Sequence, residues 1–120
     1  MPSTIGDPQF KGAVLNSTLT TALLTASSGT RIKITHITIS NGATAGTVTL
    51  SRFDTSANSG AGVTYELLNA MPIAANNATT GNIPPLELTE FYLEAGDELR
   101  GGATTTTDAK ISIDYYIITL

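Results

Sequence analysis

The chain has 120 residues, of which 41% are hydrophobic and 13% charged, with a net charge of −4 and no cysteine. This length fits one domain with a core of its own, and the lack of cysteine excludes disulfides, thiolate metal sites and a thiol nucleophile. The charged fraction is about half that of an average soluble domain. Thr, Ser, Asn and Gly must therefore supply the polar surface, as in a subunit that packs against neighbours.

The six basic residues are spread along the sequence, whereas a nucleic-acid interface needs several Lys or Arg on one face. We therefore expect no nucleic-acid partner. The first ten residues lack the charged and apolar regions of a signal peptide, and no apolar run approaches the ~18 residues of a membrane span. We expect synthesis as a soluble cytoplasmic protein with no membrane partner.

Residues 1–16 contain two prolines and two glycines and show no sustained hydrophobic period, which predicts an extended N-terminal arm that lies over the domain or over a neighbour. A disordered tail is the alternative. We expect this arm to stay out of the core sheet and to make contacts outside its own sandwich. Its large apolar side chains are the candidate interface: Ile5, Phe10, Val14 and Leu15.

Residues 17–26 are rich in Thr and precede a Ser-Ser-Gly turn, which favours a strand over a helix. Residues 31–53, RIKITHITISNGATAGTVTLSRF, contain two alternating apolar runs that predict a central antiparallel hairpin. In the first run Ile32 and Ile34 share one face while Ile37 and Ile39 share the other. Either a β-bulge lies at Thr35–His36 or the strand is covered on both sides.

The rest of the sequence predicts further strands separated by polar loops. Residues 54–62 form an exposed loop, residues 63–68 a strand with its apolar side continued by Met71 and Ile73, and residues 74–81 a second loop. Residues 83–88 contain two prolines and can only be an edge or irregular strand. Residues 91–100 are strand, tight turn and strand, with Gly96 in the turn.

Residues 101–108 are predicted to be a flexible connection, and residues 110–120 a last strand covered on both faces at its end. About eight strands with regularly spaced turns and no credible helix predict an all-β fold. We expect one antiparallel β-sandwich or jelly roll over residues 17–120, preceded by the N-terminal arm of residues 1–16.

His36 is the only histidine, so no multi-His metal site exists, and its position between isoleucines favours a packed or interface side chain. Five acidic residues gather between positions 87 and 98: Glu87, Glu90, Glu94, Asp97 and Glu98. Because no Asp-x-Asp-x-Asp-Gly calcium loop is present, we interpret them as a solvated acidic rim.

Glu90 and Glu94 lack the tryptophan and the flanking aromatic platform that a glycosidase cleft uses. The glycine-rich pieces 58–62 and 101–102 precede no helix, so they are loops and not phosphate cradles. The seven aromatic residues stand mostly at alternating strand positions, where core packing is the ordinary role. We expect no enzyme activity, no catalytic residue, no metal and no cofactor.

Several stretches resemble small β-sandwich virion proteins of tailed bacteriophages over residues 19–118. They are the run 31–53, PIAANNATTGNIPPLEL at 72–88, the turn LEAGDELR at 93–100 and IDYYII at 113–118. The resemblance implies a structural role as a capsid decoration, neck or tail accessory or baseplate protein, and it implies no catalytic residues.

From the resemblance and the composition together we expect a non-enzymatic virion subunit, made in the host cytoplasm and assembled on the particle. The expected partners are further copies of the chain and other virion proteins such as major capsid, neck or tail proteins, since symmetric assembly covers the open edges of a sandwich. The alternative is a carbohydrate- or receptor-binding module of a tail or fibre, which needs exposed aromatic rings beside polar residues.

Overall fold

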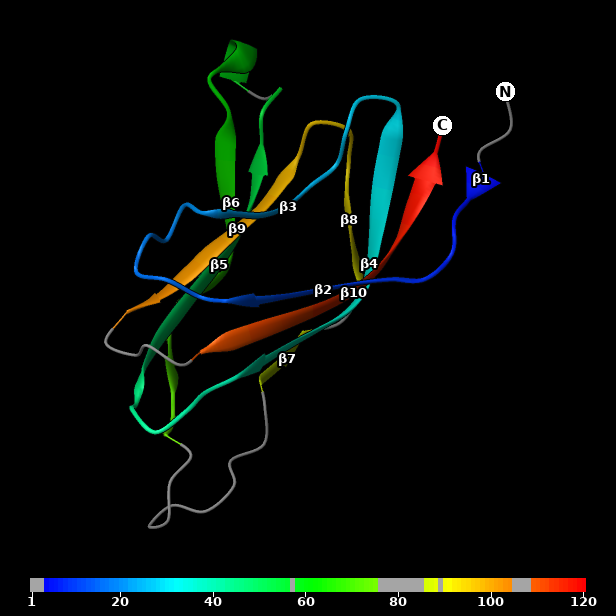
Figure 1. The fold of residues 1–120 in the computed structure, drawn as a ribbon. Helices are drawn as coiled ribbons and strands as arrows, with labels where there is room; N and C mark the ends of the chain where they lie inside the picture. The colour runs from blue at the N-terminus through cyan, green and yellow to red at the C-terminus, as the bar shows by residue number, and fades with distance from the viewer. Residues whose placement is uncertain (1–3, 57, 76–85, 89, 105–108) are drawn as a thin grey trace.

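A computed structural model describes residues 4–56, 58–75, 86–88, 90–104 and 109–120. The fold consists of two antiparallel β-sheets packed together, which confirms the predicted all-β sandwich (Figure 1). The described residues contain ten strands where the sequence predicted about eight, and one short 3-10 turn at Asn58–Gly60. They contain no helix long and apolar enough to cross a membrane.

One sheet, sheet A, has β10 (Lys110–Thr119) near its middle. The strand β4 (Thr30–Ser40) pairs along one side of β10, and β1 (Thr4–Ile5) and β2 (Gln9–Val14) pair along the other. Two short strands, β7 (Leu86–Leu88) and β8 (Phe91–Leu93), pair with the far side of β4. Sheet A therefore joins the first and last strands of the described chain.

The other sheet, sheet B, has the order β3 (Ala22–Thr25), β9 (Glu98–Thr104), β5 (Gly46–Asp54) and β6 (Val63–Ile73). The two sheets enclose a core that has fifteen buried hydrophobic members among the described residues, all of them aliphatic. They are Leu15, Leu23, Ala26, Ile32, Ile34, Ile37, Ile39, Val48, Leu50, Leu93, Leu99, Ala103, Ala109, Ile111 and Ile113.

A β-bulge in β4 explains the irregular isoleucine pattern. Asp114 of β10 lies opposite His36, but the next residue, Tyr115, lies opposite Ile34, so Thr35 is an extra residue in β4. The Thr35 hydroxyl donates a hydrogen bond of 3.0 Å to the Asp114 carbonyl. All four isoleucines of β4 are at most 2% exposed. The bulge thus turns both halves of the strand toward the core, and this alternative of the sequence prediction is confirmed.

The predicted hairpin of residues 31–53 is wrong, because β4 and β5 belong to different sheets. Both strands carry buried apolar side chains, and the core forms when these face each other across the sandwich. The connection between them is held by Asn41, whose side-chain amide donates to the carbonyls of Thr44 (2.7 Å) and Ala74 (3.2 Å). Alternation alone showed that both runs were strands, but not which strand each one paired with.

Gly101 and Gly102 lie in the buried part of β9 and not in a loop, so that prediction is also wrong. A Cβ at Gly101 would come within 2.7 Å of the Thr49 carbonyl oxygen, and one at Gly102 within 2.5 Å of the Asn16 carbonyl oxygen. The backbone of β9 approaches its neighbours so closely that only glycine fits there. Residues 105–108 of the predicted connection lie outside the described residues.

The predicted strand of residues 17–26 is shorter in the structure, since β3 covers only Ala22–Thr25. The carboxamide oxygen of Asn16 accepts hydrogen bonds from the Thr18 N–H (2.9 Å) and the Thr21 hydroxyl (3.1 Å). The Thr18 carbonyl in turn accepts from the Thr21 N–H at 3.2 Å. These bonds stabilise a turn in place of the first half of the strand.

The apolar side predicted for residues 63–73 does not face the core as a whole. Tyr65, Leu67 and Met71 are 37–47% exposed, and only Leu68 and Ile73 pack against the core from this strand. The pairing of β6 with β5 has two register shifts, and each extra residue exchanges the faces of the strand.

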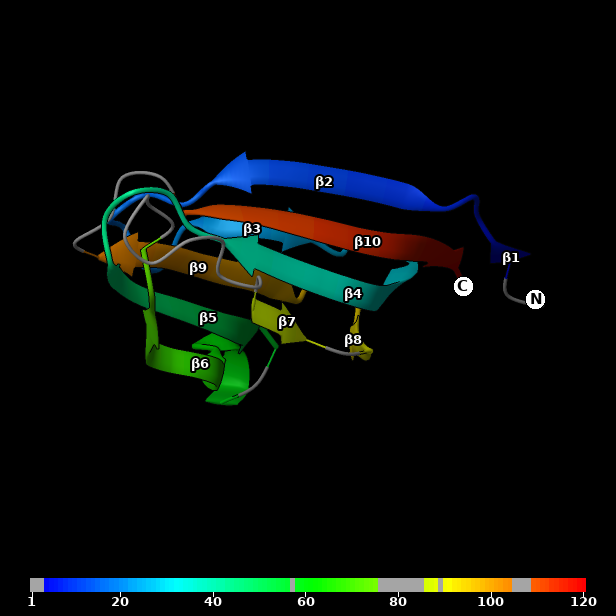
Figure 2. The ribbon, with the colours of Figure 1, turned by 90° about the horizontal axis from the view of Figure 1, so that it is seen from below.

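The end of β10 is not covered on both faces, contrary to the prediction: Ile117 is 37% exposed and Leu120 59%. Figure 2 shows why, since sheet A extends beyond sheet B at the end that carries β1 and the C-terminus. Tyr116 and Ile118, on the face opposite to Ile117, are half-buried.

Candidate interaction surface

The strand β2 forms an edge of sheet A and carries two of the four predicted interface residues. Its register places Phe10 opposite Asp114 and Val14 opposite Lys110. The alternate residues of β10, Ile111 and Ile113, are buried in the core, so Phe10 and Val14 lie on the outer face of the sheet. They are 66% and 59% exposed.

Ile5 continues this apolar edge. It lies on β1 opposite Ile118, is 67% exposed, and lines a small pocket on the outer face with Ile118, Tyr116 and Lys33. We call Ile5, Phe10 and Val14 the apolar edge. All three are among the most exposed large apolar side chains of the described residues.

Leu15 does not belong to the apolar edge. It is 2% exposed and part of the core, and its N–H donates to the Ala109 carbonyl at 2.8 Å. The expectation that residues 1–16 stay out of the core sheet is wrong for the described part, because β1 and β2 pair with β10 and Leu15 packs inside. Pro8 and Gly12 hid this strand in the sequence, although residues 9–14 do alternate between two faces.

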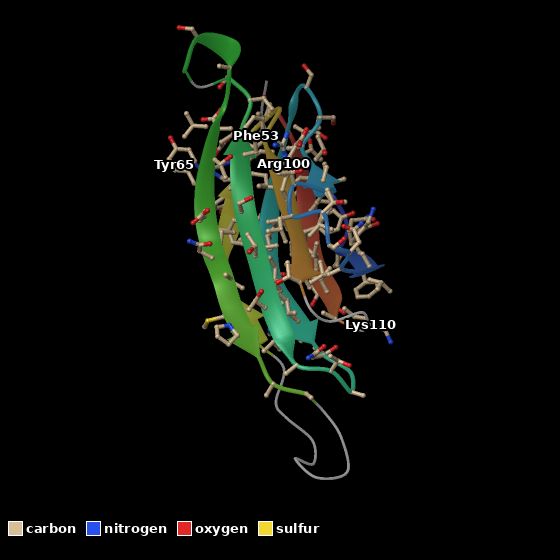
Figure 3. All side chains as sticks on the ribbon, turned by 90° about the vertical axis from the view of Figure 1, so that its left-hand side faces the viewer. Phe53, Tyr65, Arg100 and Lys110 are labelled. Carbon is tan, nitrogen blue, oxygen red and sulfur yellow. The ribbon has the colours of Figure 1, made fainter. Side chains whose placement is uncertain are left out.

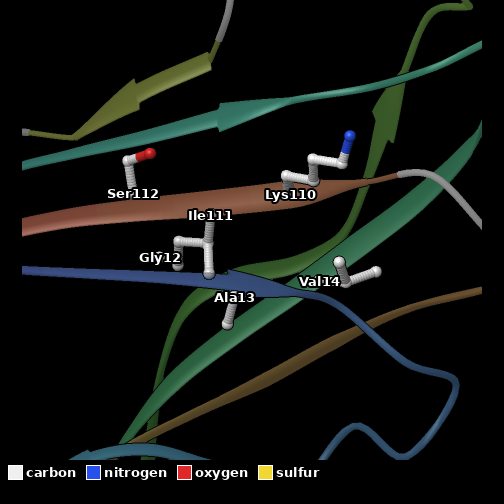
Figure 4. Close-up of a pocket in the computed structure, with 6 residues that line it drawn as sticks. All are labelled: Gly12, Ala13, Val14, Lys110, Ile111 and Ser112. Atoms are coloured by element: carbon white, nitrogen blue, oxygen red, sulfur yellow. The ribbon is translucent and has the colours of Figure 1, made fainter.

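Gly12 shapes the apolar edge in a way that the sequence analysis missed. The tip of the Phe10 ring lies 3.2 Å from the position where a Cβ of residue 12 would be, so the ring leans forward along its own strand over the glycine. Beside it runs a groove between β2 and β10, shown in Figure 4. Its lining residues are Gly12, Ala13, Val14, Lys110, Ile111 and Ser112. The Phe-x-Gly-x-Val spacing of residues 10–14 is the signal from which this arrangement follows.

Three residues of the acidic cluster each pair with a basic side chain. Glu94 accepts from Arg31 at 2.8 Å, Glu90 lies 3.5 Å from Lys33, and Glu98 accepts from Arg100 at 2.7 Å. The described residues contain no group of three or more side chains that could hold a metal ion. Glu87 has a described backbone position in β7 only.

Asp97 is 4% exposed and is part of the turn before β9, not of a solvated rim. Its carboxylate accepts the Glu94 N–H at 3.0 Å. Burial raises the pKa of this carboxyl above its ordinary value of 3.8, against the lowering effect of the Glu94 N–H. Nearby Asp54 also raises the pKa of Asp97, and Arg52 lowers it. The carboxyl therefore holds the turn in place and is not aimed at a ligand.

The aromatic rings do not fill the core, so their predicted role is wrong for most of them. Only Phe91 and Tyr115 pack against the core, and both are partly buried. Three others stack with arginine: Tyr92 with Arg31, Phe53 with Arg100 and Tyr65 with Arg52, at 3.9, 3.6 and 5.1 Å from guanidinium carbon to ring centroid. A guanidinium over a ring is a favourable contact at a partly wet surface.

Two of these stacks lie at the same end of sheet B. Figure 3 shows Tyr65, Phe53 and Arg100 together there, on three neighbouring strands, and Lys110 at the other end of the molecule. Tyr65 is the most exposed of the three at 47%. The Phe53 ring also covers Gly62, where a Cβ would lie 2.2 Å from the ring.

His36 lies on β4 opposite Asp114 and is half-buried, as expected for a packed or interface histidine.

Comparison of the chain with protein-family models, with characterised proteins and with solved structures found no match. The apolar edge and the arginine–aromatic stacks are therefore assessed from their own chemistry.

Proposed function

We propose that the chain is a non-enzymatic structural subunit that associates with copies of itself and with other proteins of a bacteriophage particle, as a capsid decoration or as a head-to-tail or tail accessory protein. The observation that carries the assembly role is the apolar edge: Ile5, Phe10 and Val14 are each at least 59% exposed along one sheet edge. A strand edge with apolar side chains is a natural site of protein association.

The stacking and ion pairing on the outer faces support the same proposal. Arg31, Lys33 and Arg100 each contact a carboxylate of the same chain, so part of the positive charge at the surface is already paired within the subunit. The bacteriophage part of the proposal is supported only by the resemblance of residues 19–118 to small virion sandwiches.

Two measurements test this function. Sedimentation velocity over about 1–500 µM protein reports self-association, and mass spectrometry of gradient-purified particles from the organism that encodes the chain reports incorporation. We expect concentration-dependent oligomers and a fixed copy number per particle. A protein that stays monomeric throughout and is missing from the particles contradicts the proposal.

A second candidate function is a carbohydrate- or receptor-binding module. Tyr65 favours it, because an exposed ring beside Arg52 offers both a stacking surface and a polar contact. A glycan array probed with the folded protein and with Tyr65→Ala tests this function. Binding that Tyr65→Ala abolishes supports it, and a folded sample without any specific signal rejects it.

A further inference from the structure

We propose that β2 pairs antiparallel with β2 of a second copy, about a two-fold axis at Gly12, so that two copies of sheet A become one continuous sheet. This inference rests on the self-association part of the proposed function and names the strand, the register and the partner. An isologous contact of this kind closes on itself and yields a dimer.

Among the described sheet edges, β2 is the one best suited to pairing. It has six residues in a single uniform register with β10. The edge strand β6 is longer, but it has two register shifts, a positive φ of 48° at Ala70, and Pro72, all of which disrupt an edge. The edges formed by β3, β7 and β8 have four, three and three residues.

The backbone of β2 presents hydrogen-bonding groups to solvent at alternate residues. The Leu15 N–H points to β10, where it donates to the Ala109 carbonyl, and directions alternate along a strand. The N–H and C=O groups of Phe10, Gly12 and Val14 therefore point away from β10, toward the open edge. An incoming antiparallel strand can exchange hydrogen bonds with each of these residues.

The side chains select one register of this pairing. With Gly12 opposite Gly12 of the second copy, Phe10 lies opposite Val14 and all three outward-pointing residues are paired. Lys11 then faces Ala13. A shift of two residues in one direction would place Lys11 opposite Lys11, and like charges in direct opposition destabilise a sheet. A shift in the other direction removes the Val14 partner of Phe10.

The groove beside β2 fits this register. In the two-fold arrangement the Phe10 ring of each copy lies opposite Val14 of the other, next to the groove that Val14 and Gly12 line (Figure 4). Aromatic and β-branched residues in direct opposition are a favourable cross-strand pair. Because Gly12 has no side chain, the two rings have room to lie over the centre of the interface.

The dimer is expected to be weak in isolation. Six strand residues make an edge about 20 Å long, and we expect one such strand to bury less surface than the roughly 800 Å² per partner of a stable interface. We expect a dissociation constant on the order of 10–100 µM. On a particle, other contacts would hold two copies close together and strengthen the pairing.

Disulfide trapping tests the register, because the chain has no cysteine of its own. In Gly12→Cys the two introduced thiols lie across the two-fold axis, with Cα atoms about 5.5 Å apart, within disulfide reach. The Phe10 ring, whose tip lies 3.2 Å from the new Cβ, has to rotate aside, so this variant tests the backbone register and not the ring packing. The matched control is Ser112→Cys, which places the thiol opposite Gly12 on β10, one strand farther from the axis. Mild oxidation should link Gly12→Cys into a covalent dimer at least tenfold faster than Ser112→Cys.

Sedimentation of side-chain variants provides a second readout. Phe10→Ala should raise the dissociation constant at least tenfold, while Tyr65→Ala, which removes an exposed ring on β6, should leave it unchanged. Circular dichroism on each variant ensures that only folded proteins are compared.

The possible failures are distinguishable. If the protein self-associates but Phe10→Ala has no effect and both cysteine variants cross-link equally, the β2 pairing is wrong and the assembly function stands. The same holds for a protein that is monomeric at 500 µM yet present on particles. If it is monomeric and missing from the particles, both proposals are wrong.

Discussion

Deleting Thr35 should remove a large part of the stability of the sandwich. The bulge at Thr35 places Ile32 and Ile34 on the same face as Ile37 and Ile39, and each of the four is at most 2% exposed. Without the extra residue, only one half of β4 can keep its register with β10. The two isoleucines of the other half then turn to the outer face. Burial of an isoleucine contributes about 1.5–3 kcal/mol, so two of them account for about 3–6 kcal/mol.

That loss is large against the whole, since a domain of this length is stable by about 6–18 kcal/mol. Urea unfolding followed by far-UV circular dichroism measures the difference. The matched control is Thr35→Ala, which keeps the residue count and loses only the hydrogen bond to the Asp114 carbonyl, worth about 0.5–1.5 kcal/mol. If the deletion variant unfolds at the same urea concentration as Thr35→Ala, the bulge does not set the faces of β4 and our reasoning is refuted.

Three further predictions concern stability, measured at concentrations where the protein is monomeric. Leu15→Ala should cost about 2–5 kcal/mol, and Val14→Ala less than about 0.5 kcal/mol, because the first side chain is 2% exposed and its neighbour 59%; equal midpoints in urea would contradict this assignment. Gly62→Ala should be more destabilising than Gly29→Ala. Both glycines have a positive φ, but only at Gly62 would the new Cβ meet an aromatic ring, that of Phe53 at 2.2 Å. Equal melting temperatures of the two variants would show that the ring moves aside. Asp97→Asn should gain stability relative to the natural protein as the pH rises from 4 to 7. The reason is that the raised pKa of Asp97 makes this carboxyl's contribution to folding stability most favourable in acid, and the contribution falls as the carboxyl ionises in the folded state. A difference in urea midpoint that does not change with pH would argue against this.

The sequence predicted the strands better than it predicted their partners. Alternation identified β4, β5 and most of β10, and the break in the isoleucine pattern located the bulge at Thr35. The hairpin of residues 31–53 was wrong because a strand pattern shows which face is apolar and leaves open which strand lies alongside. In this fold β4 pairs with β10, about 80 residues away.

The exposure of the four candidate interface residues was predicted in part, while their role in an interface stays a prediction. Ile5, Phe10 and Val14 are exposed on one edge, whereas Leu15 was indistinguishable from them by residue type and proved to be part of the core. The aromatic rings were assigned to the core for the same reason: their alternation is real, but Tyr92, Phe53 and Tyr65 lie over arginine side chains. Such cross-strand neighbours become visible only when the register is known.

The glycines of β9 show a different limit of sequence analysis. Gly101 and Gly102 look like loop residues beside a run of threonines, yet each marks a place where two backbones come too close for a Cβ. Sequence alone cannot distinguish a glycine that allows a turn from one that allows a neighbouring backbone segment to approach closely.

The position of β10 in the middle of sheet A also determines when the protein can fold as it leaves the ribosome. Roughly 80 residues separate the end of β4 from the end of β10. At a synthesis rate of about 5–20 residues per second, β10 is therefore complete about 4–16 s after β4. During that time β1 and β2 have no strand to pair with either, since in the described part of the chain both pair only with β10. A nascent chain that ends before Lys110 should therefore remain sensitive to protease over both β2 and β4, and should acquire resistance in a single step once residues 110–119 have emerged.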